Sequence, residues 1–573
     1  MTYSRQFVAG HCYTVPMLPI SSYPASWDRM VFPVTRDRRS STSCATTFLH
    51  SGAQLPWSRY DSAHPVPVKD LGSFSLVLHT HLPWVAHNGT WPVGEEWLHQ
   101  AFTGSWRRVL RMLETLAEHG YSEVLTLGVT PVVAAMMDDP YCLSEIHAWA
   151  GRWQLRAEEL SARPDLRPLA AHEWTQATDC LADLESRWLT GGLSAVLRPL
   201  LDSGVVELLS GPATHPFQPL LTERFAAAQL RTGLADTQLR LGQRVSGIWA
   251  PECGYAPGME QFYTEHGVSH FLVDGPAVAG RTGFGHLVGD TEVVAFARDR
   301  VLSNRIWSSR TGYPGSTSYR DFHTFDHDSG FRPARVSGPG PRKLPWQPAV
   351  AAAAVLRDAQ DFVLAVLRRL AELRAEHGRP GLVVAAFDTE LFGHWWYEGP
   401  QFLSAVLRKL AQAGVQLRTL TGARQAGLVA GRSELPASSW GAGADWRVWD
   451  NQQVAELNDE LALVQKTLFE VLDDRFTDGR FTDGGSSIGR SSIGRDLVAD
   501  QLVREAFLAS SSDWAFMISR DSAADYARRR ARTHARRFFS LADALRLDPE
   551  PTGLARELRE LDGPFGQLDA RTI

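Results

Sequence analysis

The sequence has few cysteines, no long apolar run and no strong excess of charge. The five cysteines among 573 residues are odd in number and scattered, which argues against a disulfide framework and for a reducing compartment. No apolar stretch approaches the roughly 20 residues that span a bilayer, and no apolar core follows basic residues at the N-terminus. The formal net charge of −6 does not favour a nucleic acid partner. We therefore expect a cytoplasmic protein without a membrane or nucleic acid partner.

Tryptophan and histidine are abundant instead, with 19 residues of each. Many tryptophans stand beside glycine, proline, serine or acids, as in "TWPVGEEW" and "SSWGAGADWRVW". Pyranose rings have apolar C–H faces and polar edges, which suit flat aromatic platforms combined with fixed hydrogen-bonding groups. A single tryptophan more often belongs to a core, but the clusters favour a sugar ligand in an open cleft. The candidates are Trp91, Trp97, Trp307, Trp395, Trp396, Trp440, Trp446 and Trp449.

Strand-like and helix-like segments alternate from about residue 71 to about residue 430. Short apolar runs such as "FSLVLHT", "VVELLS", "GIWAP" and "GLVVAAFD" follow segments with a helical period. This alternation predicts an α/β fold with a parallel sheet, either open or closed into a barrel. Residues from about 140 to 200 predict a helical insertion, and residues 431–573 predict a C-terminal helical domain. Residues 1–70 lack a helix or strand period, so we predict a disordered N-terminal extension there.

Polar side chains follow five of the predicted strands. Because active sites of parallel α/β folds lie at the carboxyl ends of the strands, we expect these side chains at one rim. Either acid could be structural alone, Glu252 in a turn and Asp388 as a helix N-cap. Together beside a sugar site they predict glycosidic bond chemistry, retaining at a carboxyl separation of about 5–5.5 Å and inverting at about 6.5–9.5 Å. The strand-end residues are His79, His81, His215, Gln218, Glu252, Tyr255, Asp274, Asp388, Glu390 and His394.

Three other features have competing interpretations. Cys253 could be a nucleophile, but a small buried cysteine is commoner and no base is adjacent in the sequence. The pair His79 and His81 at a strand end resembles metal sites on barrels, but two histidines without a clear set of further ligands are weak evidence for a metal. The basic run from Tyr526 to Phe539 has helical spacing, which favours a solvated helix face over a nucleic acid site.

Six stretches of the sequence together resemble glycoside hydrolase family 57. They are "LVLHTHLPWV", "ELLSGPATHPFQPLL", "GIWAPECGY", "AAFDTELFGHWWYEG", "SSWGAGADWRVW" and "SDWAFMIS", in this order. The resemblance extends from about residue 71 to 545 and is strongest to the 1,4-α-glucan branching enzymes of the family. It implies an incomplete (β/α)7 TIM-like barrel with a helical insertion, and a C-terminal all-helical domain that completes the cleft. It also implies an α-glucan substrate such as amylose or glycogen, a retaining mechanism through a glycosyl-enzyme intermediate, and no metal or other cofactor.

The resemblance also implies roles for single residues. Glu252 in "APECGY" matches the nucleophile of the family, and Asp388 in "FDTELFGHWW" matches its acid/base residue. A proton donor that works near neutral pH needs a pKa raised by burial or by a nearby carboxylate. The expected substrate-binding residues are His79, Trp91, Trp97, Trp307, Trp440, Trp449 and Asp513, with His81, His215, His394 and Trp395 as further pocket residues.

The segment that precedes Trp307 departs from the branching enzymes of the family. There, a long mobile loop carries a tyrosine linked to transfer rather than hydrolysis. Here only 54 residues separate Glu252 from Trp307, and "DGPAVAGRTGFGHLVGDTE" lacks tyrosine. A lid that excludes water helps an acceptor sugar to compete for the intermediate. We predict a retaining 1,4-α-glucan branching enzyme of glycogen biosynthesis, with an α-amylase, a 4-α-glucanotransferase or a glucan-binding protein with little turnover as alternatives.

Overall fold

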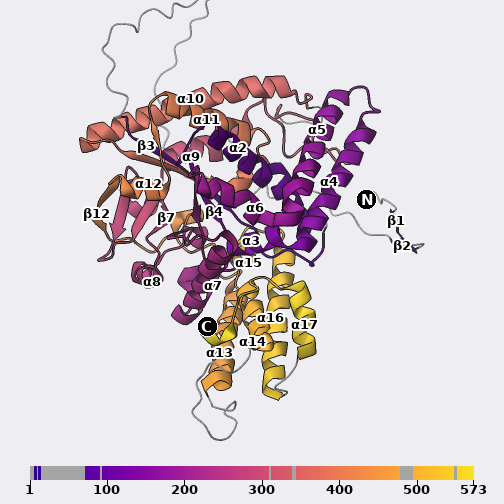
Figure 1. Cartoon of the computed structure of the whole chain (residues 1–573), viewed down its shortest axis with the longest axis vertical. Coiled ribbons are helices and arrows are strands. Elements are labelled where there is room, and N and C mark those ends of the chain that lie inside the picture. The colour runs from indigo at the N-terminus through magenta and orange to yellow at the C-terminus, as the bar shows by residue number, and fades with distance from the viewer. Residues whose placement is uncertain are drawn as a thin grey trace, which may run out of the picture.

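The computed structural model describes residues 71–90, 93–308, 311–337, 343–477, 495–547 and 552–573. Ahead of these it describes two short strands, β1 (Gln6–Val8) and β2 (His11–Tyr13), which pair antiparallel. The other residues of the predicted disordered extension, 1–70, lie outside the described residues, and so does Trp91. The barrel and the C-terminal helices are formed from residue 71 onward (Figure 1).

Seven parallel strands form a ring that is joined only weakly at two places. In ring order they are β3 (Ser73–Thr80), β4 (Leu125–Val129), β5 (Val206–Leu209), β6 (Gly247–Ile248), β7 (His270–Asp274), β9 (Val294–Arg298) and β10 (Leu382–Asp388). A bridge between Ser210 and Ile248 joins β5 to β6. The Asp299 amide donates a 2.8 Å hydrogen bond to the Val384 carbonyl and joins β9 to β10. The incomplete (β/α)7 TIM-like barrel of the sequence analysis is therefore confirmed.

The strand sequences explain both the burial of the ring and the position of its polar rim. β3 is buried along its whole length, and β10 reads "LVVAAFD" with only its last residue partly accessible. Strands covered on both faces read as continuous apolar runs rather than alternating ones. Because the strands are parallel, their polar last residues gather at one end of the ring. Asp388 on β10 lies in register opposite His79 on β3.

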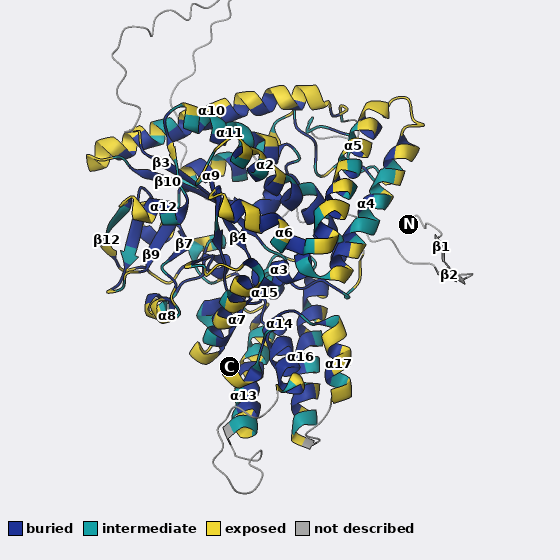
Figure 2. Ribbon diagram, in the orientation of Figure 1, coloured by how far each residue is buried: buried dark blue, intermediate teal, exposed yellow. Residues whose placement is uncertain are grey.

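Helices cover the outside of the ring. The long helix α10 (Pro348–His377) lies along one side of the barrel, with an exposed outer face and a buried inner face that includes Val355, Phe362 and Leu370 (Figures 1 and 2). Helices α4 (Pro140–Leu160), α5 (Arg167–Asp183) and α6 (Leu189–Asp202) occupy the stretch predicted as a helical insertion. The helices before residue 430 are α1 (Glu95–Ala101), α2 (Arg107–Glu118), α3 (Pro131–Asp138), α4 (Pro140–Leu160), α5 (Arg167–Asp183), α6 (Leu189–Asp202), α7 (Glu223–Leu241), α8 (Met259–Glu265), α9 (Arg300–Trp307), α10 (Pro348–His377), α11 (Gly399–Gln412) and α12 (Leu420–Gln425).

The segment between Glu252 and Trp307 is built into the barrel. All of it is described, and it consists of α8, β7, β8 (Gly285–Val288), β9 and α9 with short connections. β8 pairs antiparallel with β9 and parallel with β12 (Val429–Ser433). This segment therefore extends the second sheet and contains no long loop that could lie over the carboxyl ends of the strands.

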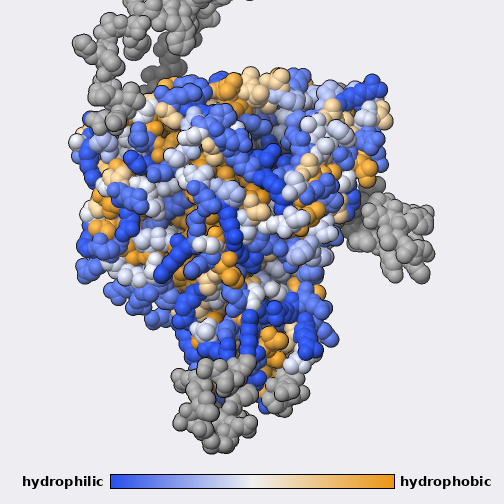
Figure 3. Space-filling view, viewed as in Figure 1, coloured by the Kyte–Doolittle hydropathy of each residue, from blue (hydrophilic) through white to orange (hydrophobic). Residues whose placement is uncertain are grey.

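The chain ends in a group of helices packed below the barrel (Figure 1). They are α13 (Ala455–Thr477), α14 (Leu497–Ala509), α15 (Ser512–Ser519), α16 (Ala524–Leu547) and α17 (Thr552–Leu561). In the basic run of α16, Arg529, Arg532 and Arg536 are exposed, as predicted for a solvated face, whereas Arg530 and His534 are buried. The face of these helices in Figure 3 is mostly hydrophilic. Within the described ranges, no helix combines the length and apolar character needed to cross a membrane.

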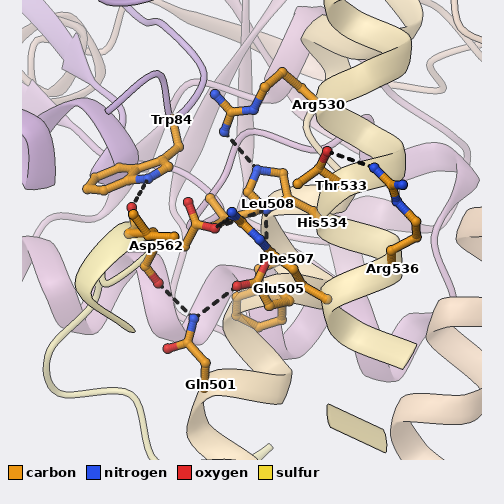
Figure 4. A network of polar contacts seen from close by, with 12 residues as sticks. Trp84, Gln501, Glu505, Phe507, Leu508, Arg530, Thr533, His534, Arg536 and Asp562 are labelled. Carbon is orange, nitrogen blue, oxygen red and sulfur yellow. Dashed lines mark hydrogen bonds and ion pairs between the residues drawn. The ribbon is translucent and has the colours of Figure 1, made fainter. Parts of the chain in front are cut away.

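A buried polar network joins α14, α16 and the residues after α17 (Figure 4). His534 makes a 2.8 Å hydrogen bond through Nδ1 to Glu505, and Arg530 donates to its Nε2 at 2.8 Å. Gln501 donates to Glu505 and to the backbone carbonyl of Asp562. Because burial and the nearby arginines lower the pKa of His534 well below its usual value, its ring is neutral and carries its proton on Nδ1. The imidazole thus links a guanidinium donor to a carboxylate acceptor.

Replacing His534 with alanine is expected to destabilise the C-terminal helices by about 3 kcal/mol or more, because buried Arg530 and Glu505 lose hydrogen bonds and a cavity remains. Urea unfolding followed by far-ultraviolet circular dichroism should show a lower midpoint. Arg536→Ala is the matched control, because Arg536 lies on the exposed face of the same helix and, among the described residues, bonds to Arg532 and Thr533 of its own helix. Its effect should stay within about 0.5 kcal/mol. Equal midpoints for both variants would contradict a structural role of the network.

Candidate active site

The residue after β6 that sequence analysis singles out has an unusual backbone conformation. Glu252 lies in a short helical turn from Pro251 to Cys253 and has a φ of 60°, and Cys253 has a φ of 50°. Residues other than glycine rarely adopt positive φ, and such strain concentrates at functional sites. His215, after β5, also has a positive φ of 57°. The backbone thus adopts a left-handed conformation shortly after each of two neighbouring strands, β5 and β6.

Two hydrogen bonds from distant parts of the chain hold the Glu252 carboxylate. The indole Nε1 of Trp440 donates to Oε2 at 2.9 Å, and the Ser512 hydroxyl donates to Oε1 at 2.8 Å. Burial raises the pKa of Glu252, with a further contribution from the charge of Asp513, while these two donors act in the opposite direction. A carboxylate that accepts fixed donors on both oxygens is oriented without needing water.

Asp388 experiences a different environment at the end of β10. Burial and then the charge of Glu252 raise its pKa to about 7, while His81 and Arg298 act in the opposite direction. A carboxyl group with such a pKa keeps its proton up to neutral pH. When two neighbouring carboxyl groups have different environments, one can keep its proton while the other is ionised. This arrangement is expected of a proton donor that works beside an ionised carboxylate.

Three histidines pack together beside the two carboxyl groups. The rings of His81 and His215 stack with centroids 3.8 Å apart, and His79 stacks on Trp249 at 4.3 Å. Burial lowers the pKa of His79 and of His215 well below the usual value, so both are neutral. His81 bonds through Nε2 to Asp513 at 2.8 Å, and its proximity holds the pKa of Asp513 at about 2. The Asp513 carboxylate next to His81 is therefore ionised near neutral pH.

His81, His215 and Asp513 lie close enough to be considered as metal ligands. The ring nitrogens of His81 already bond to Thr130 and Asp513, and those of His215 bond to Ser512 and His79. A metal ion bound to this trio would have to break several of these hydrogen bonds. The donor set fits a hydrogen-bonded cluster better than it fits a metal-binding site.

The structure brings together seven of the residues predicted for the site. Glu252, Asp388, His79, His81, His215, Trp440 and Asp513 are linked by the contacts and charges described above. Trp440 also packs edge-on against Trp249 at 5.1 Å, and the Arg298 guanidinium lies 5.5 Å from its ring. Asp274, another strand-end acid, bonds to Arg298 at 3.0 Å.

Among the remaining candidates, Trp449, Trp97 and His394 pack against rings outside this cluster. Trp449 is 1% exposed and stacks on Phe217 at 4.7 Å, so its ring is packed against a neighbour rather than open to solvent. Trp97 lies edge-on to Tyr526, and Trp307 and Trp395 are half-buried against the main core. His394 lies edge-on to Phe322, and burial lowers its pKa to about 3. Substrate binding by these residues stays a prediction.

Sequence reasoning missed two residues of the site, Ser512 and Arg298. Arg298 ends β9, a strand that the sequence analysis did not identify, although "VVAFAR" has the apolar run of its neighbours. Recognising that strand would have placed Arg298 at the rim. Ser512 directly precedes Asp513 in α15, but a serine in "SSSDWAF" carries no pattern that would distinguish it.

Two family models match the chain. A model described as Glycosyl hydrolase family 57 matches residues 75–432. A model described as 1,4-alpha-glucan branching enzyme, C-terminal, matches residues 487–572. The first match contains the seven strands of the ring except the first two residues of β3, and the second contains Ser512 and Asp513. Both carboxyl groups of the site and the helix that contacts Glu252 thus lie inside matched regions.

Individual proteins match over most of their length. A probable 1,4-alpha-glucan branching enzyme of Mycobacterium tuberculosis is 49% identical over 533 residues, which cover 89% of this chain and 99% of that one. The crystal structure of a GH57-type branching enzyme from Pyrococcus horikoshii matches with a TM-score of 0.80 and 30% identity, covering 87% of this chain and 96% of that one. The α-amylase AmyC of Thermotoga maritima shares the fold, with a TM-score of 0.74, 24% identity and coverage of 87% and 98%.

Proposed function

Because the chain belongs to glycosyl hydrolase family 57, we propose that it is a retaining 1,4-α-glucan branching enzyme. The enzyme cleaves an α-1,4 bond of a glucan donor and transfers the released chain to a 6-hydroxyl of an acceptor glucan. The observation that carries the proposal is the pair of carboxyl groups at the rim, Asp388 protonated near neutral pH and Glu252 held by Trp440 and Ser512. The likeness to the branching enzymes named above supports this choice within the family.

The reaction follows from these two groups. Asp388 donates its proton to the glycosidic oxygen as the bond from that oxygen to C1 breaks, and a Glu252 oxygen forms a bond to C1. The donor's remaining chain leaves with a new 4-hydroxyl. Ionised Asp388 then takes the proton of the acceptor 6-hydroxyl, whose oxygen attacks C1 and displaces Glu252. Two displacements at one carbon restore the α configuration.

A second candidate function is supported by the compact segment between Glu252 and Trp307. This segment forms β8, β9 and α9 and contains no long loop of its own that could cover the rim. Water or a 4-hydroxyl could then take the place of the 6-hydroxyl in the second displacement, which would make the chain an α-amylase or a 4-α-glucanotransferase. The chemistry of the first displacement is the same in all three cases, so the product decides between them.

The biological setting is part of the same proposal. We place the enzyme in the cytoplasm, in the synthesis of a glycogen-like polysaccharide. The described cysteines support a reducing compartment, because Cys142, Cys180 and Cys253 are buried free thiols. An α-glucan is the proposed partner.

The product of an incubation with amylose tests the proposal. We expect new α-1,6 linkages, seen as their proton NMR signal and as short chains after isoamylase debranching, with few new reducing ends. New reducing ends without an α-1,6 signal would make the chain a hydrolase, and redistributed linear chains would make it a 4-α-glucanotransferase. Amylose that stays unchanged would favour a glucan-binding protein. Glu252→Gln is the control in which every product should disappear.

A further inference from the structure

We infer that Ser512 is a positioning residue for Glu252. Its hydroxyl is the last donor in a chain of hydrogen bonds that runs from His79 through His215 and Ser512 to the carboxylate, with each donor pointing toward Glu252. The inference rests on the proposed role of Glu252 as nucleophile and extends it to a residue outside the barrel. Ser512 is 2% exposed and lies at the first position of α15. Its hydroxyl is 2.8 Å from Glu252 Oε1 and 3.0 Å from His215 Nδ1.

The polarity of the chain follows from counting protons. An ionised carboxylate only accepts, so the single hydroxyl proton of Ser512 points to Glu252, and toward His215 the hydroxyl accepts. His215 therefore carries a proton on Nδ1. Because its ring is neutral, Nε2 is bare and accepts from His79 Nε2 over 3.1 Å. His79 Nδ1 is then bare as well, and this buried atom has no hydrogen-bond partner among the described residues, as the end of such a chain should have none.

Ser512 is held in place independently of the carboxylate. Its backbone amide donates to the His215 carbonyl at 3.0 Å, and Ser511 forms a bridge with Pro216. The strand end that bears His215 and the helix that bears Ser512 are thus fixed to each other by main-chain contacts. The hydroxyl bonds to Oε1 of Glu252 and the Trp440 indole bonds to Oε2, so the two donors orient both oxygens.

Removing the hydroxyl should change the acidity of Glu252 in a predictable direction. A hydrogen bond to the ionised form favours ionisation, so its loss raises the pKa of Glu252. The other groups that set this pKa remain in place in the variant. The charged or titratable residues near Glu252 are His81, His215, Asp388 and Asp513, and Arg298 in turn acts on Asp388. The nucleophile must be ionised to react, so the acid limb of the pH–rate profile should move upward.

We therefore expect Ser512→Ala to lower kcat about 10- to 100-fold with little change in KM, and to move the acid limb of kcat/KM upward by about one pH unit. The measurement is initial rates on amylose between pH 4 and pH 8. Ser519→Ala is the matched control, because Ser519 ends the same helix and its hydroxyl bonds to the Val448 carbonyl. This control should retain wild-type kcat and the wild-type acid limb.

A second readout does not depend on turnover. The Trp440 indole donates to Glu252, so its ¹⁵N–¹H signal in tryptophan-labelled protein should titrate with the carboxyl group; Trp440→Phe assigns the signal, and Glu252→Gln should abolish the titration. In Ser512→Ala the midpoint should rise. If Ser512→Ala does not fold, Ser512→Cys keeps a similar volume with a weaker donor and should show a smaller rise in the same direction. An unmoved midpoint overturns the inference whatever happens to kcat, whereas a wild-type protein inactive on glucans would overturn only the proposed function.

Discussion

Glu252→Gln is expected to lower glucan transfer by at least about 10⁴-fold, because an amide oxygen cannot form and release the bond to C1. The side chain keeps its size, so the barrel should fold normally. Initial rates on amylose measure the loss. In the wild-type enzyme, a fluorinated maltosyl fluoride, which forms the intermediate quickly and releases it slowly, should leave a sugar on the peptide that contains Glu252, detectable by mass spectrometry.

The matched control for this variant is Glu265→Gln. Glu265 is an exposed glutamate at the end of α8, and the same chemical change there should leave the rate within about twofold. A sugar found on another residue, or a Glu252→Gln enzyme with substantial activity, would show that Glu252 is not the nucleophile. A sugar on Cys253 would support the alternative in which Cys253 is the nucleophile. Burial disfavours that role, because it raises the pKa of the thiol well above its usual value.

Of the two proposed catalytic carboxyl groups, only Asp388 could be placed at the rim from a local pattern. Asp388 ends an apolar run that can only be a buried strand, and parallel strands bring their last residues to one rim. For Glu252 the strand itself has only two residues, and the left-handed turn that aims the side chain has no sequence signal apart from the motif. The resemblance to a family therefore contributed more to Glu252 than periodicity did.

The aromatic residues show where sequence reasoning stops. Trp440 and Trp449 lie nine positions apart in the same glycine- and serine-rich stretch, yet one donates to Glu252 and the other is buried against Phe217. Local composition describes the neighbours of a residue along the chain, whereas its role depends on what packs against it from elsewhere. Ser512 is the extreme case, since 260 positions separate it from its partner Glu252.

Asp388→Asn should lower the rate on amylose about 10³- to 10⁴-fold, because the leaving oxygen loses its proton donor and the acceptor hydroxyl loses its base. In the wild-type enzyme the pKa of about 7 predicts that kcat/KM is high while Asp388 keeps its proton and falls as the pH rises through about 7. On the acid side the rate falls when Glu252 becomes protonated, which gives a bell-shaped profile. The alkaline limb should be absent from the residual activity of Asp388→Asn.

Donors with a good leaving group distinguish the proposed role of Asp388 from that of Glu252. With a glycosyl fluoride or an aryl maltoside, departure needs little help from an acid, so the first displacement in Asp388→Asn should lose no more than about tenfold and the intermediate should accumulate. Azide, which attacks C1 without giving up a proton, should then restore turnover and yield the α-glycosyl azide. Neither an activated donor nor azide should rescue Glu252→Gln, because that variant lacks the group that bonds to C1. If Asp388→Asn lost equally on amylose and on activated donors, Asp388 could not be the proton donor, and its raised pKa would reflect only its burial and the nearby charge of Glu252.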